Sequence, residues 1–86
     1  MKGILNMPKV LEVDGYRFFF FSNEGDPREP YHIHVSKGDA LAKFWIDPEV
    51  ELADSIGFSA KELNFIKGIV SENKEVIKEA WDGFFQ

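Results

Sequence analysis

The sequence has no cysteine and no long apolar run, and each absence excludes a class of protein. Without cysteine there are no disulfides, no thiolate metal ligands and no cysteine nucleophile, and a reducing compartment suits the chain. The longest apolar run covers only residues 18–21, whereas a membrane-spanning helix needs about 18 apolar residues. We therefore expect a cytoplasmic protein with no membrane segment.

Basic residues are also scarce, because 10 Lys and Arg face 15 Asp and Glu, for a net charge of −5. Residues 1–46 are neutral, with six residues of each sign, and residues 47–86 hold four basic and nine acidic residues. Nonspecific nucleic-acid binding depends on Lys and Arg that neutralise phosphates. A nucleic-acid partner is therefore not favoured, although the neutral first half leaves it as an alternative.

The chain lacks the motifs of nucleotide-dependent enzymes as well. It has no phosphate-binding glycine loop, no Gly-x-Ser-x-Gly and no Walker motif, so we expect no cofactor. What it does have is an apolar share of 44%, with 9 Phe, 2 Trp and 2 Tyr among 86 residues. This composition suits one domain, residues 1–86, with one hydrophobic core.

Four strand-like segments occupy residues 9–47. They are Val10–Val13, Tyr16–Ser22, Tyr31–Lys37 and Ala40–Asp47. The first two are joined by Asp14-Gly15, a pair that accepts the positive φ angles of a hairpin turn. The last two are joined at Gly38-Asp39, and Pro48 ends the fourth strand because proline cannot donate to the ladder. This pattern predicts an antiparallel four-stranded meander.

Residues 59–84 have the pattern of helix. Ser59 and Glu62 form a capping box, in which each side chain bonds the backbone amide of the other residue. Apolar residues then recur at helical spacing, and we expect a break near residues 71–73 because an unbroken helix would be too long for a domain of this size. Residues 49–57 are expected to be a connector with one helical turn at 50–53, and residues 1–6 a flexible extension. The fold class is therefore α+β, with a C-terminal helix or helix pair packed on one face of the sheet.

Alternation along the strands divides their side chains between two faces. The expected core face carries Phe18, Phe20, Ile33, Val35, Phe44 and Ile46. The other, open face carries Arg17, Phe19, Phe21, His32, His34, Lys43 and Trp45. Aromatic side chains at such positions are usually buried in a core or in an interface. We therefore expect Arg17, Phe19, Phe21, Lys43 and Trp45 to bind a partner protein or a second copy, with base stacking as the weaker alternative.

The two histidines, His32 and His34, lie on one side of a strand and leave three interpretations open. They could belong to the partner-binding cluster. They could be the catalytic acid and base of a metal-independent ribonuclease, with Arg17 or Lys43 stabilising the phosphorane and Tyr31 nearby. They could also bind a metal ion, with a third ligand from Glu24, Asp26 or Glu29.

With these residues in view, the chain resembles the small bacterial and archaeal proteins of the domain of unknown function 4160. The matching pieces are Met7-Pro8, Gly15-Tyr16-Arg17-Phe18, Ser22-Asn23-Glu24, Glu29-Pro30-Tyr31-His32-Ile33-His34-Val35, Ala42-Lys43-Phe44-Trp45, Asp47-Pro48, Ser59-Ala60-Lys61-Glu62-Leu63 and Trp81. Family members typically start at the Met-Pro, so residues 1–6 are an upstream extension. The resemblance implies a small cytoplasmic α+β protein, often encoded beside another small protein in toxin–antitoxin-like pairs. It implies no established activity.

Overall fold

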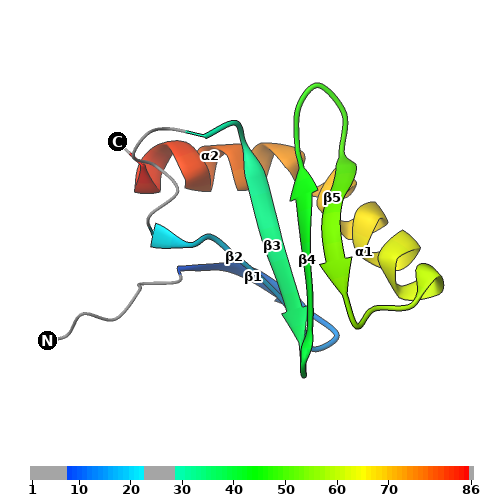
Figure 1. Cartoon of the computed structure of the whole chain (residues 1–86). Coiled ribbons are helices and arrows are strands. Elements are labelled where there is room, and N and C mark those ends of the chain that lie inside the picture. Colours follow the sequence, from blue (N-terminus) through cyan, green and yellow to red (C-terminus); the bar gives the residue numbers. More distant parts are fainter. Residues whose placement is uncertain (1–7, 23–28, 86) are drawn as a thin grey trace, which may run out of the picture.

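A computed structural model describes residues 8–22 and 29–85 of the chain (Figure 1). The extension expected at residues 1–6 lies outside the described residues. Five strands precede two helices: β1 (Lys9–Val13), β2 (Tyr16–Phe19), β3 (His32–Lys37), β4 (Ala40–Trp45), β5 (Glu51–Ile56), α1 (Ala60–Glu72) and α2 (Lys74–Phe84). The α+β class is confirmed, and the sheet has one strand more than expected.

The strands form an antiparallel meander in the order β1-β2-β3-β4-β5. The predicted hairpin between β1 and β2 is confirmed. Asp14 and Gly15 at its turn have φ angles of 50° and 83°, which is the left-handed region that this turn requires. Three strands are shorter than predicted, since β2 ends at Phe19, β3 begins at His32 and β4 ends at Trp45.

The expected connector with a helical turn at residues 50–53 is wrong, because residues 51–56 form strand β5. β5 pairs with β4, and Leu41 lies opposite Ile56 and Lys43 opposite Asp54. Residues 51–54 are all exposed, so this edge strand lacks the apolar alternation that marks a half-buried strand. The local sequence of residues 51–56 does not favour a strand, and these residues adopt the strand conformation because they pair with β4.

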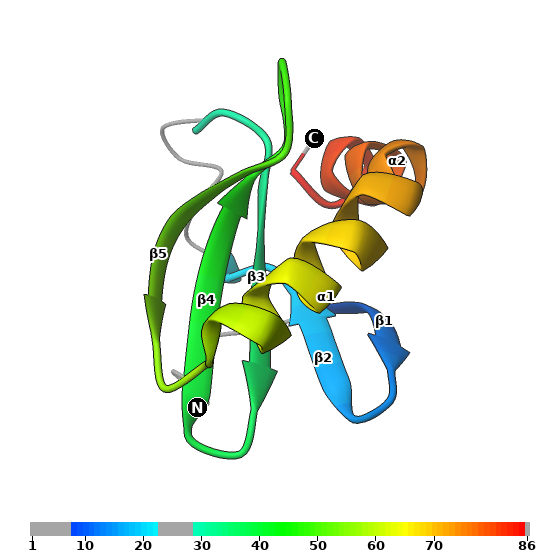
Figure 2. The same ribbon diagram turned by 90° about the vertical axis from the view of Figure 1, so that its right-hand side faces the viewer.

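The two helices lie together on one face of the sheet (Figures 1 and 2). The capping box is confirmed, since Ser59 Oγ accepts from the Glu62 amide at 3.1 Å and Glu62 Oε1 accepts from the Ser59 amide at 3.0 Å. The predicted break is also confirmed: α1 ends at Glu72, and Asn73 separates it from α2. Neither helix of the described residues is long and apolar enough to cross a membrane.

The hydrophobic core lies between the helices and the sheet. All six side chains of the expected core face are buried in it, namely Phe18, Phe20, Ile33, Val35, Phe44 and Ile46. The helices contribute a second set, Ile66, Ile69, Val70, Ile77 and Trp81. Strand alternation therefore identified the sheet side of the core correctly. On the helices, the expected Ile66, Val70 and Ile77 are buried, whereas the expected Phe84 is exposed and Ile69 and Trp81 take part without having been predicted.

Polar contacts attach α2 to the ends of β3 and β4. The Tyr31 hydroxyl donates to the Asp82 carboxylate at 2.7 Å. Asp47 lies 3.1 Å from the Lys78 ammonium and 3.6 Å from that of Lys74. The hydrogen bond from Lys78 is the main cause that lowers the pKa of Asp47, and it outweighs the opposing effect of desolvation.

The lowered pKa of Asp47 predicts a loss of stability in acid. A carboxyl group whose pKa is lower in the folded state stabilises the fold above its unfolded pKa, and this contribution disappears as the pH falls through the folded pKa. We expect the wild type to be more stable than Asp47→Asn at pH 7 and to lose that advantage near pH 3, in urea unfolding at both pH values. Asp39→Asn, at an exposed carboxylate in the β3–β4 turn, is the control. An Asp47→Asn difference that stayed constant with pH would contradict this assignment.

Candidate functional site

Strand alternation directs the residues that the sequence analysis assigned to the open face away from the hydrophobic core, but His32 at the start of β3 also contacts Trp81 of α2. Strand register brings them together, since Phe19 lies opposite His34, His34 opposite Lys43, and His32 opposite Trp45. We define the aromatic–histidine cluster as Phe19, Phe21, His32, His34 and Trp45. Strands β2, β3 and β4 position four of these residues, and Phe21 lies two residues beyond the end of β2.

The rings of the aromatic–histidine cluster pack against one another. His34 stacks on Phe19 with ring centroids 5.7 Å apart, and it meets Phe21 edge-on at 4.4 Å. The two histidine rings are 5.1 Å apart. Phe19 and His34 are only 8% and 7% exposed, and His32 is fully buried. Much of the expected aromatic surface is therefore covered by the cluster itself.

His32 lies in the interior of the protein, between Trp45 and Trp81. Its ring centroid is 5.6 Å from that of Trp45 and 4.9 Å from that of Trp81 on α2. Its Nδ1 atom lies 2.9 Å from the Pro30 carbonyl oxygen, which can only accept, so Nδ1 carries the proton. The Glu29 carboxylate is farther away, 3.8 Å from Nδ1.

Trp81 is the member of this environment that the analysis of the residues did not assign. It follows the buried Ile77 by four residues on α2, and this spacing places both side chains on one face of a helix. The sequence analysis noted Trp81 only as part of the family resemblance, and no sequence signal linked it to His32. Only the packing of α2 on the sheet brings the two rings together.

The catalytic and metal-binding assignments of His32 and His34 stay predictions, but the geometry restricts them. A general acid or base must reach the proton that it transfers, and the fully buried His32 ring leaves little room for a substrate. Within residues 8–22 and 29–85, no group of three or more His, Cys, Asp or Glu could hold a metal ion. The proposed ligands Glu24 and Asp26 lie outside the described residues.

The remaining residues that the sequence analysis assigned to partner binding differ in how far their side chains are exposed. Lys43 and Trp45 are half-buried, and the Lys43 ammonium sits 4.4 Å from the centre of the Trp45 ring. The same ammonium is 3.8 Å from Glu29. Arg17 is exposed and lies opposite Ser36, and it lines a second pocket of about 90 Å³ together with Phe19.

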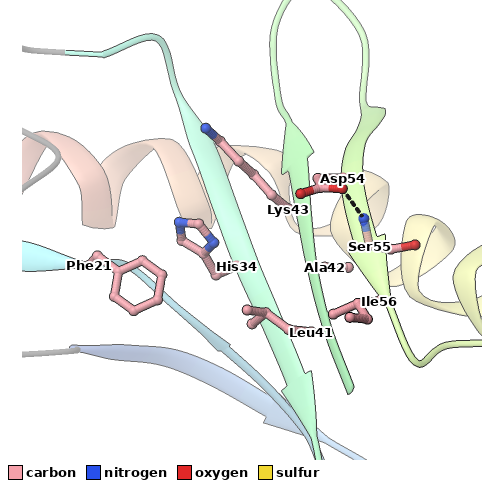
Figure 3. A pocket seen from close by; sticks show the side chains of 8 residues that line it. All are labelled: Phe21, His34, Leu41, Ala42, Lys43, Asp54, Ser55 and Ile56. Carbon is pink, nitrogen blue, oxygen red and sulfur yellow. Dashed lines mark hydrogen bonds between the residues drawn. The ribbon is translucent and has the colours of Figure 1, made fainter. Parts of the chain in front are cut away.

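A pocket opens beside the cluster, between β3, β4 and β5 (Figure 3). Its volume is about 140 Å³. It is lined by Phe21, His34, Leu41, Ala42, Lys43, Asp54, Ser55 and Ile56. Phe21 and His34 form one wall, Leu41 and Ile56 form the apolar side opposite, and Lys43 and Asp54 place opposite charges at the upper end (Figure 3).

The size of this pocket decides what it can hold. Sites for drug-sized ligands and cofactors measure about 300–1,000 Å³, whereas a cavity of about 150 Å³ takes a single benzene ring. The pocket therefore fits one apolar side chain better than a complete small-molecule substrate. Sequence analysis missed the part of the lining in residues 54–56, because it treated β5 as a connector.

A comparison with protein families finds one match, to the family described as a domain of unknown function (DUF4160), over residues 15–82. The matched region contains β2 to β5, both histidines and every residue that lines the pocket. No curated protein and no solved structure matches the chain.

Proposed function

The chain belongs to the family of the domain of unknown function DUF4160, and we propose that it is a protein-binding module. The binding site is the sheet face opposite the helices, centred on the pocket between β3, β4 and β5. The partner is a second protein of a two-protein pair, in line with the toxin–antitoxin-like pairs that the resemblance suggests. The alternative partner is a second copy of the same chain, which would make the complex a homodimer.

The observation that carries the proposal is a pocket of one-side-chain size with an exposed apolar rim. Leu41 and Ile56 are opposite each other on β4 and β5, and they are 37% and 71% exposed. Binding energy in protein interfaces concentrates where an anchor side chain fills a desolvated pocket. A pocket of about 140 Å³ has the volume for such an anchor.

The surroundings of the pocket suit the same role. Phe21 and Trp45 are half-buried, so each leaves part of an aromatic ring for a partner to cover, and aromatic residues are enriched in interfaces. The charges of Lys43 and Asp54 fit the polar rim that surrounds the apolar centre of an interface. Phe19 packs against His34 and Phe21 of the pocket wall, and Arg17 lines a second, smaller pocket together with Phe19.

Replacing Ile56 with aspartate should abolish the complex without unfolding the protein. The side chain is 71% exposed, so the fold loses little, whereas the complex would bury a carboxylate without a partner. We expect an affinity loss of about 30-fold or more, the size of a hot-spot effect. The measurement is size-exclusion chromatography with light scattering of the chain mixed with the protein encoded by the neighbouring gene, and of the chain alone for self-association.

Val76→Asp is the matched control. Val76 is a β-branched residue on α2 that is 50% exposed, and this helix lies on the opposite side of the sheet (Figure 2). The control variant should form the complex like the wild type. If Ile56→Asp kept full binding, or if both variants lost it equally, the binding site would not be this face.

A further inference from the structure

Strand β5 forms one edge of the sheet. Within residues 8–22 and 29–85 it pairs with β4 on one side and with no strand on the other, and its outer edge runs along the border of the molecule (Figure 2). Backbone N–H and C=O groups at such an edge can pair with an added strand. Many peptide-binding domains recognise extended segments in this way.

The charged residues of β5 and its flanking segments in the sequence are all acidic, although Lys43 on β4 lies opposite Asp54. Residues 44–60 contain four acidic residues, Asp47, Glu49, Glu51 and Asp54, and no Lys or Arg. Asp47 is held by Lys74 and Lys78, whereas Glu49, Glu51 and Asp54 are exposed. The strand therefore presents an acidic edge to any added strand.

We propose that β5 binds an extended basic segment of the partner protein as an added strand of the sheet. This inference rests on the proposed function and specifies the partner's chemistry. Lys or Arg of the segment would pair with Glu51 and Asp54, and a long apolar side chain would cross β5 into the pocket. Adjacent strands are about 4.8 Å apart, and long side chains reach neighbours about 7–8 Å away, so the pocket is within reach.

The same charge argues against a second copy at this edge. Pairing β5 with another β5 would bring Glu51 and Asp54 of both chains close together, and like charges on adjacent strands are destabilising. Charged side chains are a common protection of edge strands against self-association. Charges of a single sign deter an identical strand but attract a basic one.

The test uses two synthetic ten-residue peptides. In the first, every second position carries lysine or leucine in turn and threonine lies between them, so that lysine and leucine share one face of the strand. In the second, glutamate replaces lysine. Each is titrated into the ¹⁵N-labelled protein, and amide shifts are followed by NMR at low and at physiological salt. We expect the lysine peptide to shift the amides of residues 51–56 most, with an affinity that falls as salt increases. The glutamate peptide should not bind.

The variant Glu51→Lys/Asp54→Lys should weaken binding of the lysine peptide by about tenfold or more and allow the glutamate peptide to bind. If the charge-reversed variant does not fold, the neutral variant Glu51→Gln/Asp54→Asn should show the same loss of lysine-peptide binding. Shifts centred on the helices, equal binding of both peptides, or unchanged binding by the folded variants would overturn the proposal.

The two proposals fail in different ways. If Ile56→Asp loses the partner complex but the lysine peptide does not bind β5, the edge is not used, and the binding face stands. If the peptide binds β5 but Ile56→Asp keeps the complex, the edge accepts basic strands, and the proposed function is wrong.

Discussion

Replacing Trp81 with alanine is expected to lower the free energy of unfolding by about 3–5 kcal/mol, the usual cost of truncating a buried tryptophan. Trp81 is only 1% exposed. Its ring centroid lies 4.4 Å from that of Phe85, 5.2 Å from Phe20 and 4.9 Å from His32. Removing the ring leaves a cavity where α2 meets both the core and the aromatic–histidine cluster.

A loss of this size is large for a small domain, because the total stability of a folded protein is only about 5–15 kcal/mol. The melting temperature should fall by about 12 °C or more, measured by circular dichroism together with urea unfolding. Val76→Ala, at an exposed position of the same helix, should change the stability by no more than about 0.5 kcal/mol. A Trp81→Ala protein as stable as this control would show that α2 does not pack on the sheet through this ring.

Replacing His32 with alanine should also destabilise the fold, by about 2–4 kcal/mol. The fully buried ring fills the space between Trp45 and Trp81, and its Nδ1–H donates to the Pro30 carbonyl at 2.9 Å. The variant therefore loses packing and leaves that carbonyl without its donor. The measurement is urea unfolding at neutral pH.

A second substitution separates the two causes. His32→Leu refills much of the space but cannot donate a hydrogen bond, so its stability should lie between those of the wild type and His32→Ala. It should still form the partner complex, because His32 supports the face rather than touching the partner. If His32→Ala were as stable as the wild type, the structural role of His32 would be wrong. A catalytic or metal-binding role of His32 would then be the hypothesis to test.

The parts of the fold that local sequence determines were predictable. The Asp14-Gly15 turn and the capping box of Ser59 and Glu62 each depend on neighbouring residues. Alternation on β3 and β4 likewise identified which side chains face the core. In all these cases the physical cause lies within a few residues of the feature, so a single sequence contains it.

The remaining features depend on contacts between distant segments. β5 has little apolar alternation and is a strand because it pairs with β4, so the pocket that β5 completes was invisible in the sequence. The burial of His32 depends on Trp81, which is 49 residues away along the chain. For this reason sequence analysis described the face of the sheet opposite the helices as more open than it is.

The central claim is that the sheet face around the pocket is the protein-binding surface. Hydrogen–deuterium exchange, measured on the chain alone and in complex with the protein of the neighbouring gene, tests this claim most directly. We predict slower exchange in β4 and β5 on complex formation, with unchanged exchange in α1 and α2. Slower exchange confined to the two helices, with β4 and β5 unchanged, would contradict the claim.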